Sequence, residues 1–312
     1  MQHCCIKILL MRIIIMYIGF QNIFYPQKLF THMKKTTQIF AAFFLLSVSF
    51  TACTKEVKET EDEISAETLA KIENLGFSTY EAKKIPEGYL VEGDIILTEE
   101  NLINPSRTPS LIFAQEEQYR TTNLVSRAKH DRIQIALDNS SSNHQNVFTA
   151  ALEEAVRRYN NDVGTGYTLY FDIVSKSQSP DITIVAYYEN SNVLGSAGFP
   201  TSAGDPYNQV RMNTYHYGTG TDLTNVNYIA TIIAHEIGHC IGMRHTDYMD
   251  RSFSCGGRKQ NEEKPFSSGY GAIHIPGTPT SADNASWMLA CVSRGTNRPF
   301  NANDKTALNH LY

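Results

Sequence analysis

The segment that most constrains this chain is HEIGHCIGMRH, residues 235–245. It ends a run of apolar residues spaced three and four apart, which predicts a helix with His235 and His239 on one face, about 6 Å apart along the axis. At that spacing both imidazoles can bind one metal ion. Five such fixed positions recur by chance in about one in 10,000 chains of this length, so an incidental pair of core histidines is a poor explanation.

Gly242 explains how a third histidine joins the first two. A continuing helix would carry residue 245 away, whereas glycine adopts the left-handed conformation that ends a helix and turns the chain. His245 then becomes a ligand with His235 and His239, and three nitrogens leave the fourth position of a catalytic zinc open for water. Glu236 lies close enough to that water to act as general base. We therefore expect one catalytic zinc ion.

The extended motif resembles that of the metzincin metalloendopeptidases. Three segments, HEIGHCIGMRHTDY (235–248), SWMLAC (286–291) and the closing NRPFNANDKTALNHLY (297–312), are similar to the dual-action HEIGH metallopeptidases of bacteria. The resemblance covers residues 120–312. It implies an upper subdomain with a mixed sheet and two long helices, and a lower, mostly irregular subdomain with a C-terminal helix. It also implies that Met288 forms the methionine turn beneath the zinc.

The periodicity of the chain independently predicts an α+β fold. Alternating apolar residues predict strands near 133–137, 169–173, 182–186 and 209–213, and helical spacing predicts helices near 146–159 and 224–243. Asn146 is placed to cap the first helix, and Asp304 favours the start of a closing helix near 303–311. The order strand, helix, strand, strand predicts a small mixed sheet backed by a helix.

Around the metal, the resemblance has limits. Where serralysins and astacins have a tyrosine two residues after the turn methionine, this chain has Ala290. Tyr248 is a candidate substitute for stabilising the oxyanion, although we favour a packed surface tyrosine. Asp247 can orient a zinc histidine or bond within its own turn, and we favour the turn. Leu194–Pro200 takes the place of the edge strand along which metzincin substrates lie, with a flexible loop as the alternative.

Residues 1–52 have the pattern of an export signal. A basic start at Met33, which we take as the true start, precedes an apolar run, residues 39–50, shorter than the roughly 20 residues of a membrane-spanning helix. Small residues before Cys53 resemble a bacterial lipoprotein signal, in which that cysteine is lipidated; simple secretion is the alternative. We expect an exported protein, lipid-anchored to a bacterial membrane at the outer membrane or cell surface, as in Bacteroidetes.

The charge balance excludes a nucleic-acid partner. Residues 1–52 hold five of the 27 basic side chains and no acidic one, so the remainder carries 22 basic against 32 acidic groups. Neutralising phosphates requires a basic face. We expect a peptide or protein substrate, contact with the membrane through the lipid anchor, and a monomer.

Residues 53–120 are predicted to form a lipidated tether and a candidate pro-segment, and residues 121–312 the metallopeptidase domain. The stretch from 64 to 128 has too few periodic apolar residues for a core of its own. Within it, VEGDI (91–95) resembles the F-x-G-D stretch of astacin pro-segments, whose aspartate occupies the open zinc position. Asp94 is then a candidate zymogen latch, released by cleavage near Arg120 or Arg127. The alternative is an ordinary strand with a solvent-facing Asp94.

Three cysteines remain in the catalytic region, so at most one internal disulfide can form there in an oxidising compartment. We favour a disulfide between Cys255 and Cys291. Cys240 lies within the predicted zinc helix and is expected to be a buried thiol.

Together these features predict a zinc-dependent endopeptidase that hydrolyses peptide bonds with a zinc-bound water activated by Glu236. The alternative is a non-catalytic, zinc-containing, peptide-binding surface lipoprotein. The intact Glu236 favours the enzyme, because a protein that only binds zinc has no need of a general base.

Overall fold

The computed structural model describes residues 63–103, 118–138, 143–257, 272–279 and 281–312. All of these belong to one compact unit, Glu59–Tyr312. The predicted signal region, residues 1–52, and the predicted lipidation site Cys53 lie outside the described residues. No helix of the described part is long and apolar enough to cross a bilayer.

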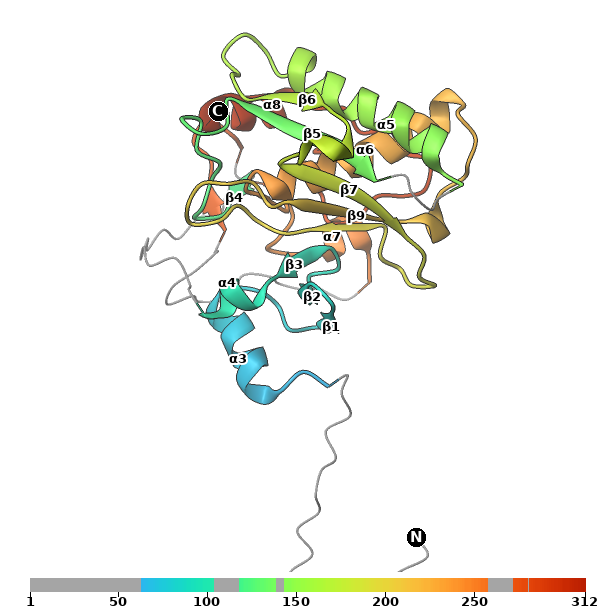
Figure 1. The fold of residues 1–312 in the computed structure, drawn as a ribbon. Helices are drawn as coiled ribbons and strands as arrows, with labels where there is room; N and C mark the ends of the chain where they lie inside the picture. The colour runs from blue at the N-terminus through green and yellow to red at the C-terminus, as the bar shows by residue number, and fades with distance from the viewer. Residues whose placement is uncertain (1–62, 104–117, 139–142, 258–271, 280) are drawn as a thin grey trace, which may run out of the picture. The chain divides into compact units, whose positions relative to one another are not determined.

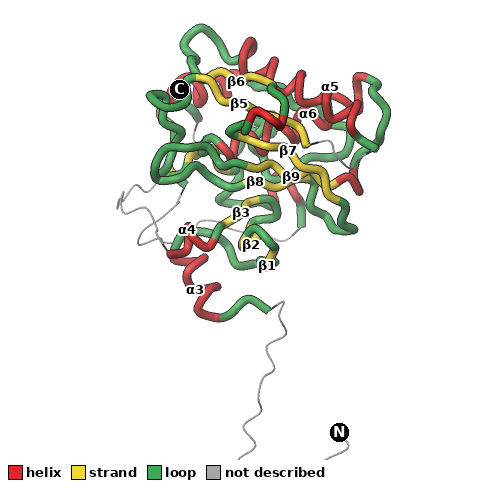
Figure 2. The backbone as a smooth tube through the Cα atoms, in the orientation of Figure 1, coloured by secondary structure: helices red, strands yellow, loops and turns green. Residues whose placement is uncertain are grey.

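A mixed sheet runs through the described chain. Its strands are β1 (Lys83–Ile85), β2 (Gly88–Val91), β3 (Ile95–Leu97), β5 (Arg132–Asp138), β6 (Tyr170–Ile173), β7 (Ile182–Tyr187), β8 (Gly195–Ala197) and β9 (Gln209–Asn213). They lie in the order β1-β2-β3-β8-β9-β7-β5-β6 (Figures 1 and 2). β5 is parallel to β6 and β7, and β7 is parallel to β9, whereas β8 is antiparallel to β9.

The central strands lie where the alternation of apolar residues predicted them. In β5, Ile133 and Ile135 are buried while Arg132 and Gln134 are exposed, so one face of the strand joins the core. The strand predicted at 209–213 is β9 with the same bounds. The fold is therefore α+β with a mixed sheet.

Two long helices share the core with the sheet. α5 (Gln145–Arg157) runs on into a π-helical turn, η1 (Arg158–Asp162), and packs against α6 (Leu223–Cys240), as Figure 1 shows. The prediction that Asn146 caps the first helix is wrong, because the helix already begins at Gln145 and His144 before it provides no side-chain cap. α8 (Ala302–Leu311) closes the chain, capped by Asn301 together with Asp304.

Regular elements are short between α6 and α8, as predicted for a mostly irregular lower subdomain. The described ones are β10 (Met243–Arg244), α7 (Ser252–Cys255) and β11 (Ile273–His274). β10 and β11 both pair with β4 (Tyr119–Arg120), which is the middle strand of a small sheet. β4 thus lies at the predicted boundary between the pro-segment and the catalytic domain.

The N-terminal section corrects one expectation. Residues before 104 were predicted to be too poor in apolar groups for a core. They nevertheless form a buried cluster, which includes residues of the helices α3 (Ala66–Asn74) and α4 (Glu99–Ile103). Its buried members are Ile72, Leu75, Phe77, Tyr89, Val91, Ile95, Leu97, Leu102 and Phe199. Phe199 lies far along the chain, so this small core is completed by the catalytic region. Periodicity along the N-terminal section could not reveal that contribution.

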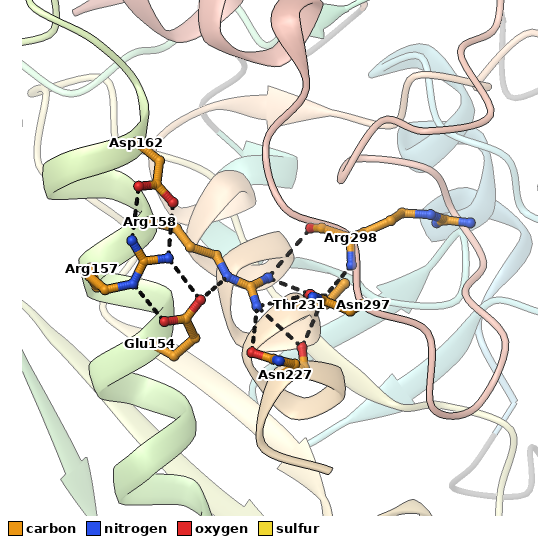
Figure 3. Close-up of polar contacts among 8 residues, drawn as sticks. All are labelled: Glu154, Arg157, Arg158, Asp162, Asn227, Thr231, Asn297 and Arg298. Atoms are coloured by element: carbon orange, nitrogen blue, oxygen red, sulfur yellow. Dashed lines mark hydrogen bonds and ion pairs between the residues drawn. The ribbon is translucent and has the colours of Figure 1, made fainter. Parts of the chain in front are cut away.

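A buried arginine ties α5 to α6 and to the segment before α8 (Figure 3). Arg158 is 1% exposed, and its guanidinium donates to Glu154, Thr231 and Asn297 at 2.8, 3.2 and 3.0 Å. The adjacent Arg157 binds Glu154 from the surface, with its side chain 46% exposed. Two neighbouring arginines thus share one carboxylate but differ in burial.

We predict that Arg158→Met destabilises the chain by about 3–5 kcal/mol, because it leaves buried acceptors without a donor. Arg157→Met is the matched control and should cost less than about 1 kcal/mol, since an exposed ion pair contributes little. Urea unfolding of residues 54–312 measures both free energies. Equal losses for the two variants would contradict the structural role of Arg158.

Candidate metal centre and active site

α6 carries the first two predicted ligands on a buried face. Its first turn is capped by Asp222, whose side chain accepts from the backbone N–H of Asn225 at 3.1 Å. One turn separates His235 from His239, and both are buried, at 7% and 0% exposed. The predicted spacing on one helical face is therefore present in the structure.

Gly242 ends this helix in the way its sequence position predicts. Its φ is +107°, and a Cβ atom there would lie 2.8 Å from the carbonyl oxygen of Asn123. Glycine is thus required both by the backbone conformation and by the close approach. The chain then turns into β10 and brings the fully buried His245 to the other two histidines.

Hydrogen bonds define which ring nitrogens face the centre. Nδ1 of His235 lies 2.9 Å from the carbonyl oxygen of Trp287, and Nδ1 of His239 lies 2.9 Å from that of Met243. A carbonyl oxygen only accepts, so each Nδ1 carries the proton and each Nε2 presents a lone pair. Burial, then the neighbouring His235 and His245, hold the pKa of His239 well below its usual value, which keeps that ring neutral.

The Nε2 atoms of His235 and His239 lie too close together for two neutral rings whose lone pairs face each other. Nε2 of His235 and Nε2 of His239 lie 3.1 Å apart, each with a lone pair directed inward. Two acceptors at this distance repel unless a cation lies between them. The donor set of three imidazoles fits zinc.

Asp94 completes the cluster from outside the motif. Its Oδ2 lies 3.1 Å from Nε2 of His245 and 3.4 Å from Nε2 of His235, and its Oδ1 lies 4.0 Å from Nε2 of His239. One ligand atom from each of the four residues lies within 4.8 Å of the others. Burial alone would raise the pKa of Asp94, but the three histidines lower it well below its usual value.

A strained turn between β2 and β3 delivers this carboxylate. Glu92 has a φ of +53° and Gly93 a φ of +90°, both in the left-handed region. A Cβ atom on Gly93 would lie 3.0 Å from Nη2 of Arg251. The turn is therefore held closely against the catalytic region, with Asp94 at the histidines and not facing solvent.

Glu236 lies beside the cluster, next to β8. It is 2% exposed, and a Cβ atom on Gly195 of β8 would lie only 2.8 Å from its Oε1. Its Oε2 is buried without a hydrogen-bond partner among the described residues. Burial, then the charge of Asp94, raise the pKa of Glu236 well above its usual value. A carboxyl group with a raised pKa and a free oxygen is suited to accept a proton.

The predicted methionine turn lies against the helix that carries the ligands. Met288 is fully buried, and its Sδ would lie 2.6 Å from a Cβ atom added to Gly238 of α6. Its carbonyl oxygen accepts from the N–H of Thr246 at 2.8 Å. The preceding Trp287 accepts from His235, so this turn both supports and orients the ligands.

The remaining predicted residues occupy supporting positions. Asp247 accepts from the N–H of Ala290 at 2.9 Å and from the hydroxyl of Ser254, so these bonds link it to other segments, whereas the sequence analysis favoured bonds within its own turn. Tyr248 is packed edge-on against Tyr119, but at 3% exposed it is a core and not a surface residue.

The cysteines are arranged as the sequence analysis favoured. A disulfide joins Cys255 to Cys291, with an S–S distance of 2.09 Å. Cys240 is a buried free thiol, and burial raises its pKa well above the usual value.

Sequence reasoning missed the charged residues that surround the centre. Arg244 is fully buried and bonds Glu92 at 2.7 Å, while Arg251 and Arg298 line a cavity of about 920 Å³ next to His235. Arg244 lies within the zinc motif itself, so a buried cation needing a counter-ion could have been suspected there. Nothing in the local pattern marks Arg298, because its position depends on the path of an irregular segment.

Known proteins were compared with the chain in three ways. Solved structures that match include two of myroilysin, at 16% and 14% identity with TM-scores of 0.34 and 0.33; they cover 57% and 59% of this chain and 90% and 84% of theirs. High choriolytic enzyme 1, a hatching enzyme zinc-protease from the medaka fish Oryzias latipes, matches at 12% identity and a TM-score of 0.30, over 61% of this chain and 92% of its own.

A search of curated protein sequences found no match. The family model described as dual-action HEIGH metallo-peptidase matches residues 90–312, which include the histidine motif, the methionine turn, Asp94 and the closing helix. The chain belongs to the dual-action HEIGH metallo-peptidase family.

Proposed function

We propose that this protein is a metzincin-type zinc endopeptidase in which Glu236 activates the attacking water. The convergence of unprotonated Nε2 atoms from His235 and His239, joined by His245, is the observation that carries the proposal. A metal that served structure alone would not need a buried carboxyl with an unpartnered oxygen beside it, so Glu236 argues against the alternative of a non-catalytic peptide-binding protein.

The positions of the groups suggest a separate role for the metal, for Glu236 and for β8 in the proposed reaction. Zinc, when bound, supplies a Lewis acid that polarises the carbonyl of the scissile bond and lowers the pKa of water to about 7. Glu236 takes the proton of the attacking water and delivers it to the leaving amine, which balances the hydrolysis. β8 lies beside Glu236 and would become an edge strand if β3 left it, so that an extended substrate could pair with its backbone.

We predict different effects for two substitutions at the centre. Glu236→Gln should retain zinc and lower kcat by about 10²–10⁴-fold, because it removes only the base. His239→Ala should lose both zinc and activity, while His310→Ala, at an exposed histidine of α8, should lose neither. Metal content after dialysis and turnover of a peptide library measure these effects. Near-normal turnover by Glu236→Gln would show that the assigned base is wrong.

The same geometry supports a latent state. Asp94 occupies the space between the histidines where a water would lie, and a carboxylate can take that position. β3, which follows it, pairs in parallel with β8 at Ile95 and Ala197, and the N–H of Ala197 donates to the carbonyl oxygen of Asp94 at 2.9 Å. We therefore propose that the N-terminal section blocks both the metal and the substrate edge.

A buried ion pair holds this segment in register. Glu92 and Arg244 are 1% and 0% exposed, and Glu92 also accepts from the N–H of Ser78 at 3.0 Å. The guanidinium of Arg244 lies 4.4 Å from the ring centroid of Phe77. Glu92 lies two residues before Asp94, and Arg244 is next to His245. The ion pair between Glu92 and Arg244 therefore holds the turn that carries Asp94 close to a predicted metal ligand.

Activation requires that this section leave, and the structure limits where the chain can be cut. Gln118 is buried and bonds Ser286 and Asp304, the N–H of Thr121 donates to Gly242, and the N–H of Val125 donates to Tyr312. Cutting near Arg120 or Arg127 would remove β4 from the small sheet. We therefore propose a cut before Gln118 in place of one near Arg120 or Arg127.

We predict that Asp94→Ala, in a chain that starts at residue 54 and is kept unprocessed, raises peptidase activity above that of the unprocessed wild type. It should also speed removal of zinc by a chelator, because the metal gains an open position. Glu100→Ala, at an exposed acid of α4, is the control and should change neither rate. Equal activity of the unprocessed wild type and Asp94→Ala would remove Asp94 as the latch.

We further propose that the protein is exported and anchored by lipid at Cys53, on the strength of the sequence pattern around residues 33–53. Labelling with a fatty-acid analogue in a bacterial host should mark the wild type. The label should be lost in Cys53→Ser and kept in Cys5→Ser, because Cys5 precedes the predicted start at Met33. Label retained by Cys53→Ser would contradict the anchor.

A further inference from the structure

A cavity of about 920 Å³ adjoins the centre and is lined by residues of α6, of the segment after the methionine turn and of the N-terminal section. Its lining includes His235 and Glu236 at one end, Ile232 and Thr231 one turn earlier on α6, and Leu289–Val292 after the methionine turn. The cavity is therefore continuous with the catalytic groups and has a wall that belongs to the catalytic region.

Arg298 brings a guanidinium group to this wall. Its backbone N–H donates to the hydroxyl of Thr231 at 2.9 Å, and its Nη1 donates to the carbonyl oxygen of Cys291 at 3.1 Å. Among the described residues it forms no ion pair. The acids that influence its pKa, Asp247 and Asp304, already accept from other donors. Burial lowers the pKa of Arg298, because the charged guanidinium is partly removed from water.

The buried network of Arg158 fixes where Arg298 lies. Arg158 binds the hydroxyl of Thr231, the side chain of Asn297 and the carbonyl oxygen of Arg298, the last at 3.5 Å. Figure 3 shows that Arg158 and Thr231 both contact the backbone of Arg298, while the side chain of Arg298 is directed away from them. The guanidinium is thus presented to the cavity from a rigid base, which favours selective recognition over adaptive contact.

The other charges of the cavity are distributed unevenly. Glu81, Lys83 and Asp94 belong to the section that leaves on activation. Glu189, in the loop before β8, and Glu236 belong to the catalytic region, as do Arg251 and Arg298. A Cβ atom on Gly93 of the latch would lie 3.0 Å from Nη2 of Arg251. Removal of the latch therefore takes away two carboxylates, Glu81 and Asp94, and leaves both guanidinium groups in the lining.

The direction of a bound peptide places this wall on one side of the scissile bond. A peptide pairing antiparallel with β8, the more stable arrangement of two strands, runs from Ala197 towards Gly195. Its residues before the scissile bond then follow the Ala197 end, which β3 covers in the latent state. Its residues after the scissile bond reach Val193, Leu194 and the cavity.

We propose that Arg298 is a specificity-determining residue that selects an aspartate or glutamate directly after the scissile bond. The inference deepens the proposed peptidase function and rests on it. A planar guanidinium can bind a carboxylate through two parallel hydrogen bonds, which an uncharged isostere cannot reproduce.

The test uses the chain from residue 54 with Asp94→Ala, before and after limited proteolysis, and paired peptides that differ only by Asp or Asn after the scissile bond. We expect kcat/KM to favour Asp by at least about tenfold, or ~1.4 kcal/mol. Arg298→Met should bring this ratio to about one while the Asn peptide is still cleaved. Arg298→Glu should instead favour Lys at that position. Arg294→Met, at an exposed arginine of the same segment, should keep the wild-type ratio.

Other results would overturn the inference in distinguishable ways. Cleavage of library peptides without preference for an acid, or an acid preference that survives Arg298→Met, contradicts the role of Arg298 alone. If Arg251→Met loses the preference and Arg298→Met keeps it, Arg251 and not Arg298 selects the acid, which contradicts the inference. No turnover of any peptide by a zinc-loaded protein contradicts the peptidase function and, with it, this inference.

Discussion

The structure depends on three histidine nitrogens that must face one another without protons. For His235 and His239, the carbonyl oxygens of Trp287 and Met243 enforce this by accepting hydrogen bonds from the Nδ1–H groups. Both acceptors lie outside the helix that carries the ligands, so its end at Gly242 and the methionine turn are requirements of the centre. Burying unpaired acceptor nitrogens costs free energy, and a metal cation bound between them offsets this cost.

In the proposed latent arrangement, two carboxylates of one turn each lie where a positive charge belongs. Asp94 lies at the proposed metal position, and Glu92 pairs with the buried Arg244. Leaving Arg244 without its partner would strand a charge in the interior, which is costly, so the turn is held by electrostatics and not only by the β3 pairing. The apolar cluster adds to this hold through Phe199, whose ring lies 5.6 Å from that of His239.

The metal centre could be predicted because its residues lie close together in the sequence. Features that depend on contacts between distant segments were harder to predict. The ligands, Glu236 and the role of Gly242 follow from spacing within eleven residues, and strands such as β5 follow from simple alternation. Asp94 lies far from the motif, and only resemblance to a known pro-segment indicated it. The N-terminal core was misjudged because Phe199 completes it, and Arg298 was missed because hydrogen bonds from other elements position it.

One helix links the proposed catalytic centre to the residue that we propose selects the substrate. Thr231 and His235 lie four residues apart on α6, so the group that fixes the backbone of Arg298 shares a helical face with a metal ligand. The disulfide of Cys255 with Cys291 constrains the same wall from its other side, and Cys291 also accepts from Arg298. The wall is therefore held at both ends by groups that do not bind the metal. Side chains in it can change without displacing the histidines, so selectivity can vary while the hydrolytic centre stays fixed.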